Sequence, residues 1–346
     1  MRIPLPLLLA ALALGACAGA EKRPAPPEPP LIQIGSSQRL WTGVAASGDR
    51  IWVNFPRRDR SVSTSVAELV EGRVVPWPNE AWNAWTPNDS GEEQFVAVQS
   101  VWADDRGSLW VVDTGNPLQE GVIGRGPRLF RFATQTGELY RAYSFPREAW
   151  GPDSYYNDVR VDHRTGTAYL TDSSEGGIVV LDLKSGAARK VLADHPSTRA
   201  ETDALQIDGA TFLREVHADG LALTPDGKWL FYAPLTGHTL WRVPTEALRD
   251  PAADPAARVE KIREIVATDG MAMAPNGNLF LGGLEESAIY VLRPDGSYDR
   301  LIRDERLSWP DSLAFDGNGD LLVTTTHLHL REDQRPSYGL WRIDLR

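Results

Sequence analysis

Cysteine is almost missing from this chain, because Cys17 is the only one among its 346 residues. A single cysteine cannot form an internal disulfide, a cysteine-ligated zinc site or a haem-attachment motif. The rest of the chain also offers no thiol nucleophile. Its stability must therefore come from burying apolar side chains, which a chain of this length can do.

Positive charge and familiar catalytic motifs are also scarce. The formal net charge is −11, which argues against nucleic acid or an anionic membrane surface as the main partner and suits a cationic or metal ligand. The sequence contains no Gly-x-Ser-x-Gly elbow, no His-Glu-x-x-His pair and no phosphate-binding loop. These absences leave no basis for a serine hydrolase, a zinc protease or a P-loop nucleotide site.

Long hydrophobic runs are missing too, and the one apolar segment, Leu5–Leu14, is too short to span a bilayer comfortably. It leads into Leu14-Gly15-Ala16-Cys17, which resembles a bacterial lipobox. We therefore expect residues 1–17 to be a lipoprotein signal peptide with Cys17 as the lipidated residue. Because Ala18 follows, the expected location is the bacterial cell envelope, at the outer membrane and facing the periplasm. An ordinary signal peptide and secretion remain the alternative.

What the sequence does contain is one pattern repeated six times, a turn rich in Asp, Asn and Gly followed by an apolar strand. The copies occupy residues 46–55, 104–113, 162–172, 224–233, 274–283 and 316–325. Self-similarity at a period of roughly 40–50 residues, with about four strands in each repeat, indicates an all-β, six-bladed β-propeller. We expect the propeller to occupy residues 41–346.

The segments outside the repeats have expected roles as well. Residues 18–40 combine a Pro-rich tether with a strand near 31–35, which we expect to pair with the C-terminal strand and close the ring. Two insertions, 194–217 and 245–259, are long enough to cover a pocket, and the second has a short helical turn expected at 245–249.

A short polar motif precedes five of the repeats, and a propeller brings the start of every repeat to its axis. Asn157, Asp219, Asp269 and Asp311 stand in four of these motifs. Carboxylates crowded at an axis must bind a cation, share a proton or stay in water. Oxygen ligands suit calcium or magnesium. The alternative is that each Asp only caps a strand by accepting backbone N–H bonds.

Histidines and aromatic residues border these motifs. His217 lies two residues before Asp219, so on a strand its side chain would point the same way and could act as a base near neutral pH. His327 and His329 show the same spacing after the sixth repeat. Trp309 and Tyr156 are expected to form an aromatic wall for a ring or an amine, although packing in the core is the commoner fate of such residues.

Five stretches, at 155–162, 176–183, 217–248, 268–283 and 306–315, resemble the Yellow/major royal jelly protein family in a bacterial form. The resemblance implies a six-bladed β-propeller that binds a small cyclic or aromatic molecule in its axial pocket. Some members of that family are dopachrome-converting tautomerases, and others bind biogenic amines. Applied to this chain, it implies proton abstraction and return, with Asp219, Asp269 or His217 as the base.

The same repeats resemble, more weakly, the gluconolactonase and regucalcin group of propellers. That resemblance implies one divalent cation (calcium, magnesium, manganese or zinc) held by Asn157, Asp219 and Asp269. The glutamate that completes the metal site in that group has no counterpart here, because the first repeat begins with Thr42 and Gly43. Three functions therefore stay open: a dopachrome-type tautomerase, a metal-dependent lactonase and a non-catalytic ligand-binding or scaffolding propeller. For all three functions, the expected partner is a small-molecule ligand, if there is one. We expect contact with the membrane only through the N-terminal lipid, and no binding of nucleic acid.

Overall fold

The computed structural model describes residues 27–346. The expected signal peptide and its lipidation site, Cys17, lie outside the described residues. Within 27–346, no helix combines the length and the apolar character that crossing a bilayer requires.

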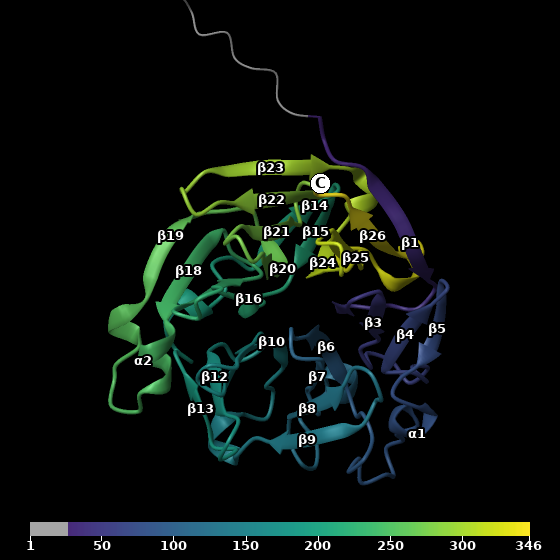
Figure 1. Ribbon diagram of the computed structural model, residues 1–346, viewed down its shortest axis with the longest axis vertical. Coiled ribbons are helices and arrows are strands. Elements are labelled where there is room, and N and C mark those ends of the chain that lie inside the picture. The colour runs from purple at the N-terminus through teal and green to yellow at the C-terminus, as the bar shows by residue number, and fades with distance from the viewer. Residues whose placement is uncertain (1–26) are drawn as a thin grey trace, which may run out of the picture.

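Six four-stranded antiparallel sheets surround one axis as the blades of a propeller (Figure 1). The first three blades follow the chain from the inside outwards: β2 (Val44–Ser47), β3 (Arg50–Asn54), β4 (Val66–Val70) and β5 (Arg73–Pro76); β6 (Val98–Ala103), β7 (Ser108–Asp113), β8 (Arg128–Ala133) and β9 (Leu139–Ser144); β10 (Tyr156–Asp162), β11 (Thr167–Asp172), β12 (Ile178–Asp182) and β13 (Ala188–Val191). Blades 4 and 5 repeat the arrangement with β16 (Ala218–Leu223), β17 (Trp229–Pro234), β18 (Thr239–Pro244) and β19 (Glu260–Glu264); β20 (Thr268–Met273), β21 (Leu279–Gly283), β22 (Ala288–Leu292) and β23 (Tyr298–Arg303). The all-β six-bladed propeller expected from the repeats is thus confirmed.

The sixth blade joins the two ends of the described chain. It contains β24 (Pro310–Phe315), β25 (Leu321–Thr325), β26 (Tyr338–Ile343) and, outermost, β1 (Leu31–Ser37). Strand β1 pairs with β26 in antiparallel register, with Ser36 opposite Gly339. The pairing expected between the two terminal segments is present, and it closes the ring.

The core is distributed between the blades rather than gathered in one place. One buried apolar cluster lies at each of the six junctions between neighbouring blades. At the junction of blades 2 and 3, for example, Trp110 from β7 packs with Val159 from β10 and Leu170 from β11. Alternation along each strand supplies both faces of a blade with apolar residues, so every blade is held by its two neighbours.

The innermost strands share a local irregularity that matters for the site. The pairing register shifts in β6, β10, β16, β20 and β24 at the polar motif of each repeat. A bulge of this kind adds a residue on one strand and redirects its side chain. The bulges therefore place the motif side chains at the axis, while the rest of each strand keeps its pairing with the blade.

The remaining elements lie in the connections. A separate hairpin pairs β14 (Ala204–Ile207) with β15 (Ala210–Leu213), inside the insertion 194–217. Short helical turns are α1 (Glu80–Asn83), α2 (Thr245–Arg249), η1 (Pro117–Gln119), η2 (Arg147–Ala149), η3 (Pro196–Thr198), η4 (Ala256–Arg258), η5 (Glu305–Leu307) and η6 (Glu332–Gln334). The turn expected at 245–249 is therefore present as α2. It stands at the outer rim, so the second insertion does not cover the axis (Figure 1).

Candidate functional site

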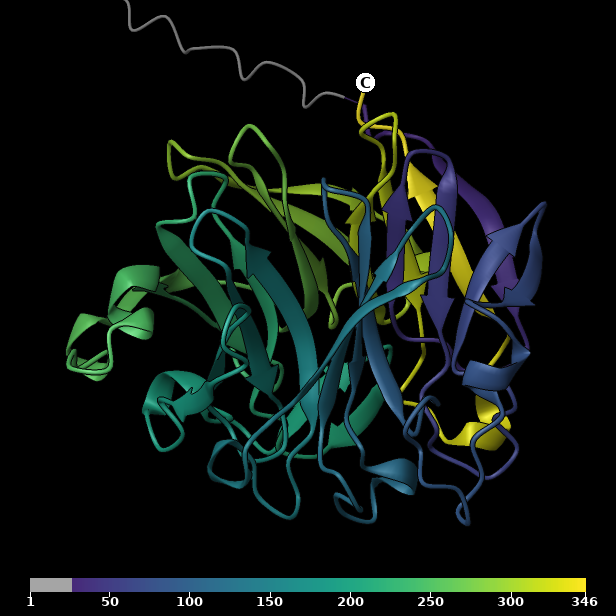
Figure 2. The same ribbon diagram turned by 60° about the horizontal axis from the view of Figure 1, so that its bottom comes forward.

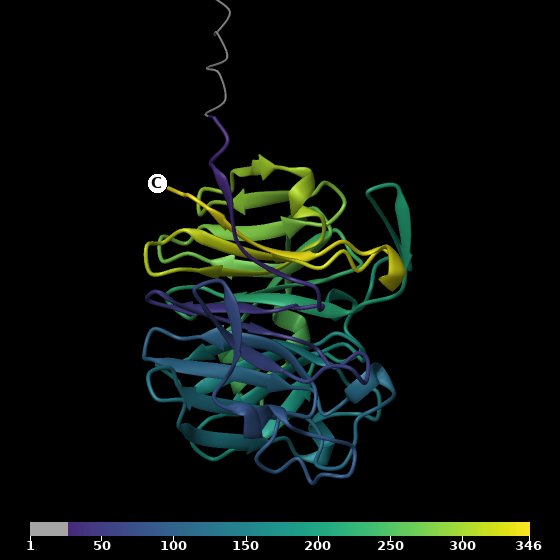
Figure 3. The ribbon, with the colours of Figure 1, turned by 90° about the vertical axis from the view of Figure 1, so that its right-hand side faces the viewer.

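A cavity of about 480 Å³ opens on the propeller axis, at the end where the first insertion reaches over the blades. Figure 2 shows the yellow turn around η6 and the blue loops of the first blades at this lower end, and Figure 3 shows the η6 turn and the β14–β15 hairpin on the same side. Five residues expected from the sequence line the cavity together: Asn157, Asp219, Asp269, Asp311 and Trp309.

A chain of hydrogen bonds crosses the cavity floor between three blades. The Tyr155 hydroxyl donates to Gln99 Oε1 at 2.7 Å, and Gln99 Nε2 donates to Asn157 Oδ1 at 3.3 Å. Asn157 Nδ2 then donates to Asp219 Oδ2 at 2.7 Å. Buried polar groups that satisfy one another in this way hold a fixed geometry, so the floor is preorganised.

Asp219 and Asp269 form a buried carboxyl pair on neighbouring inner strands. Burial raises the pKa of Asp219 well above its usual value, and the negative charges of Asp269, Asp158 and Asp311 raise it further. Contact between the two side chains raises the pKa of Asp219 and lowers that of Asp269. Ionisation of one carboxyl therefore disfavours ionisation of the other, so the two groups titrate as a pair.

The pKa of the Asp269 carboxyl is set by neighbouring groups that act in opposite directions. Burial raises the pKa of this carboxyl, while the Trp309 indole Nε1, which donates to Asp269 Oδ2 at 2.7 Å, lowers it. Asp158 raises the pKa and Arg58 lowers it, which leaves the value at about 7. Burial and the charge of Asp269 also raise the pKa of Asp311 well above its ordinary value. At neutral pH, the floor therefore holds both protonated and ionised carboxyl groups.

Aromatic side chains form the wall of the cavity, but Tyr156 is not one of them. Its hydroxyl donates to the Ala149 carbonyl at 2.6 Å, and its ring packs edge-on against Phe145 in the core between blades. The prediction for Tyr156 is wrong, because adjacent residues on a strand face opposite ways and Tyr155 is the one that lines the cavity. Trp309 and Phe212, whose ring centroids are 4.8 Å apart, complete the wall.

The histidines singled out in the sequence are buried but lie outside the cavity lining. His217 Nδ1 accepts the backbone N–H of Ala200, a residue of the first insertion, at 3.0 Å. It is therefore not brought together with Asp219 and Asp269. Burial lowers the pKa of His327 to about 4. The ring of His329 stacks on Trp309, with centroids 5.9 Å apart, while Leu328, between the two histidines, reaches the cavity.

Three arginines and two polar residues of the lining were not expected from the sequence. Arg58, Arg214 and Arg335 come from connections outside the repeats, and Gln99 and Tyr155 belong to the floor. Gln99 could have been found from its place at the motif of the second repeat. The arginines carry no repeated signal, so only the folded ring brings them together.

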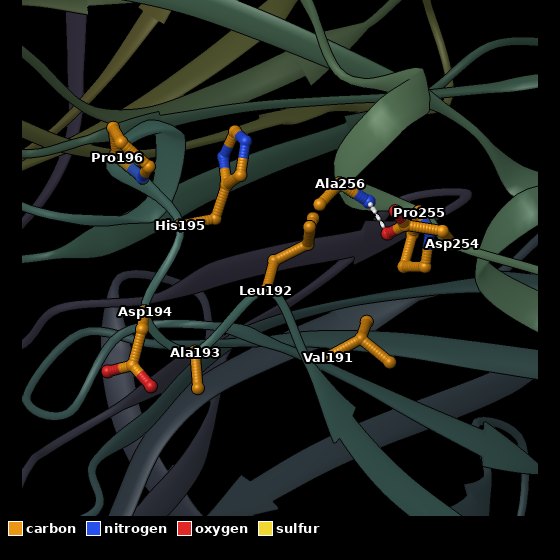
Figure 4. A pocket seen from close by; sticks show the side chains of 9 residues that line it. All are labelled: Val191, Leu192, Ala193, Asp194, His195, Pro196, Asp254, Pro255 and Ala256. Atoms are coloured by element: carbon orange, nitrogen blue, oxygen red, sulfur yellow. Dashed lines mark hydrogen bonds between the residues drawn. The ribbon is translucent and has the colours of Figure 1, made fainter.

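Two further hollows in the described part of the chain lack such a convergence of groups. A surface depression beside η4 is lined largely by aliphatic and proline side chains and has one imidazole, His195 (Figure 4). His195 Nδ1 lies 2.7 Å from Ser197 Oγ. A cavity of about 580 Å³ opens at the other end of the axis. There, Arg160 lies 3.7 Å from Asp158, and both side chains of this ion pair are half-buried.

The family model of the major royal jelly proteins matches residues 96–335. The chain belongs to the major royal jelly protein family. It is 25% identical over 229 residues to major royal jelly protein 6 of Apis mellifera, covering 62% of this chain and 51% of that relative. For major royal jelly protein 3 of the same organism, the identity is 24% over 205 residues, covering 56% and 38%. The chain thus spans about half or less of the length of these royal jelly relatives.

Solved structures share the propeller fold of this royal jelly family member. A gluconolactonase from Xanthomonas campestris aligns with a TM-score of 0.57 at 14% identity, covering 91% of this chain and 89% of that one. A calcium-binding regucalcin from Agrobacterium tumefaciens aligns with a TM-score of 0.51 at 15% identity, covering 91% of this chain and 96% of that one. A streptogramin B lyase aligns with a TM-score of 0.52 at 14% identity, covering 92% of this chain and 98% of that one. At such identities the likeness shows the fold alone.

The metal site of gluconolactonase-like propellers does not fit the donors found in this royal jelly family member. Asn157, Asp219 and Asp269 do meet at the floor, but the first blade offers only Thr42, whose hydroxyl donates to the Gln99 carbonyl at 2.8 Å. The positive charge of Arg58 already acts on Asp269. Across residues 27–346, no three His, Cys, Asp or Glu side chains are spaced to hold a metal ion.

Proposed function

We propose that this protein binds a small cyclic or aromatic molecule in its axial cavity and shifts a proton within it, as a dopachrome-type tautomerase does. The observation that carries the proposal is the buried Asp219–Asp269 carboxyl pair, in which Asn157 donates to Asp219 and Trp309 donates to Asp269. A pKa of about 7 for Asp269 suits a group that must gain and lose a proton near neutral pH.

The two carboxyls have complementary roles in this reaction. The Asp269 carboxylate accepts a proton from a C–H group of the ligand, and the electron pair of the broken bond moves into the ring system. The protonated Asp219 gives its proton to a second atom of the ligand, so the reaction is an isomerisation and needs no co-reactant. Asn157 Nδ2, bonded to Asp219 Oδ2, holds that carboxyl in place. The positive charge of Arg58 stabilises negative charge that develops on the ligand.

The cavity wall supports a flat ligand. Trp309 is fully buried, stacked on His329 and met edge-on by Phe212. The half-buried Phe212 ring therefore offers the aromatic surface on which a flat ligand can stack. In this proposal, the protein works in the bacterial envelope, because the segment that ends at Cys17 resembles a lipoprotein signal.

Asparagine substitutions test the carboxyl pair. Asp269→Asn and Asp219→Asn keep the side-chain shape but cannot exchange the proton, and general acid–base catalysis is worth about 100-fold to 10,000-fold. We expect each variant to lose about 100-fold or more of the dopachrome conversion rate, followed by absorbance. Asp226→Asn changes an exposed turn carboxylate and should keep full activity.

The same assay separates the alternatives. Activity retained by both floor variants would rule out the proton shift proposed for the pair. Wild-type protein that binds the ring but never converts it would replace the tautomerase by a ligand-binding propeller. The assay is repeated after dialysis against a chelator, with metal content measured by elemental mass spectrometry. Loss of the conversion together with about one divalent ion per chain would contradict a metal-free proton shift. Hydrolysis of a lactone that dialysis abolishes would favour the metal-dependent lactonase.

A further inference from the structure

Three arginines stand around the axial cavity without a carboxylate partner. Arg58 lies between β3 and β4, Arg214 directly follows β15, and Arg335 directly follows η6. Each therefore comes from a different connection. Within residues 27–346, no carboxylate oxygen approaches any of the three guanidinium groups within ion-pair distance.

The three guanidinium groups have few hydrogen-bond partners. Arg58 Nε is buried and has none among the described residues. Arg214 makes one long bond, from Nη1 to Gln119 Oε1 at 3.4 Å. Arg335 donates from Nε to the Leu330 carbonyl at 3.0 Å. Arg58 Nε is the buried donor among them, and a buried donor without a partner costs free energy. Arg335 is half-buried and Arg214 is exposed, so their remaining N–H groups are open to a ligand.

Positive charges also lie close together at the mouth of the cavity, the part lined by Arg58, Arg214 and Arg335. Burial lowers the pKa of Arg214, and the positive charge of Arg58 lowers it further, while Asp219 and Tyr155 raise it. The chain has more acidic than basic residues, and arginines elsewhere find partners, such as Arg128 with Asp113 at 2.9 Å and Arg306 with Asp304 at 2.6 Å. An anion bound at the mouth would relieve the repulsion and fill the unused donors.

We propose that Arg58, Arg214 and Arg335 form an anion subsite that binds a carboxylate carried by the ring-shaped ligand. Guanidinium groups match carboxylates because their forked N–H groups bind both oxygens. The three arginines outnumber Asp153 and Glu332, the carboxylates that line the cavity outside its floor. They orient the ligand with its carboxylate outwards and its reacting atoms against Asp219 and Asp269. The ligand class is a flat ring that bears a carboxylate, rather than an amine without one. The identity of the reaction rests on the proposed function, but the subsite concerns binding alone.

A matched pair of probes tests the subsite. Indole-2-carboxylate and its methyl ester share a ring and differ in charge, and their dissociation constants are measured by calorimetry. We expect wild-type protein to prefer the acid by about tenfold or more, because hydrogen bonds to charged groups are the stronger ones. Arg58→Gln and Arg335→Gln should each remove most of that preference. Arg60→Gln changes an exposed arginine two residues from Arg58, outside the cavity lining, and should keep it.

Binding in the Asp269→Asn variant separates this inference from the proposed reaction. A preference for the acid that persists in this variant supports the subsite even if no conversion is ever seen. Equal binding of acid and ester by wild-type protein, or an unchanged preference in both arginine variants, would overturn it. So would failure of indole-2-carboxylate to bind at millimolar concentration. Thermal melts of every variant check that the ring remains folded.

Discussion

At the scale of single residues, Asp269 shows how opposing effects can set a proton affinity. Burial and the neighbouring acid Asp158 raise its pKa, while the Trp309 indole and the Arg58 charge lower it. Burial outweighs the others, so the pKa settles at about 7. A carboxyl in water would be ionised throughout the neutral range. The aromatic wall is therefore part of the acid–base chemistry and not only of ligand packing.

Two adjacent tyrosines provide a matched test of which face of β10 meets the ligand. Tyr155→Phe and Tyr156→Phe each remove one buried hydrogen bond, to Gln99 and to the Ala149 carbonyl, and each should cost about 1 kcal/mol of unfolding free energy. Only Tyr155→Phe should weaken ring binding, by roughly threefold to tenfold. Calorimetry and thermal melts measure both effects, and equal ligand affinities in the two variants would contradict the assignment.

At the scale of elements, the bulged inner strands explain what could be predicted from the sequence. Asn157, Asp219, Asp269 and Asp311 were found because each occupies the same position of a repeat, and the bulges direct them to the axis. Tyr156 was misplaced because alternation fixes which residue faces the core only once the strand start is known. The arginines of the mouth belong to unrepeated loops, so no periodic pattern in the sequence predicts their position.

The closing strand allows a test at this scale. Deleting residues 31–37 removes β1, which contributes Leu31 and Ile34 to two inter-blade clusters and pairs along β26. We expect a loss of roughly 3 kcal/mol or more from the buried apolar surface alone, together with aggregation through the exposed edge of β26. Circular dichroism melts measure the change, and an unaltered melting temperature would show that β1 does not hold the ring closed.

At the scale of the whole molecule, the acidic floor makes folding depend on pH. An unfolded aspartate releases its proton near pH 4, whereas folded Asp269 keeps its proton up to about pH 7. Between these values, the folded state binds more protons than the unfolded state, so stability falls as the pH rises. The buried histidines act in the opposite direction, because burial lowers the pKa of His327 to about 4.

A comparison with Asp269→Asn isolates the contribution of the carboxyl. The variant cannot lose a proton there, so its stability should fall less than that of the wild type between pH 4.5 and pH 7.5. The two losses of unfolding free energy should differ by at most roughly 4 kcal/mol, because the pKa of the Asp269 carboxyl is about three units higher in the folded state than in the unfolded state. Urea unfolding at both pH values measures it. Parallel pH profiles for the two proteins would show that the carboxyl is not buried with a raised pKa.

The seam of the sixth blade has a consequence for engineering. The backbone N–H of Asp344 donates to the carbonyl of Pro30 at 3.3 Å, so the two ends of the described chain lie beside each other on one strand pair. A short linker across that seam would make the backbone circular, and new ends could be opened in a turn between two other blades. Such circular permutants should all keep the same cavity floor and the same arginine mouth. Every blade packs between two neighbours, so the fold does not require the chain to begin at one particular blade.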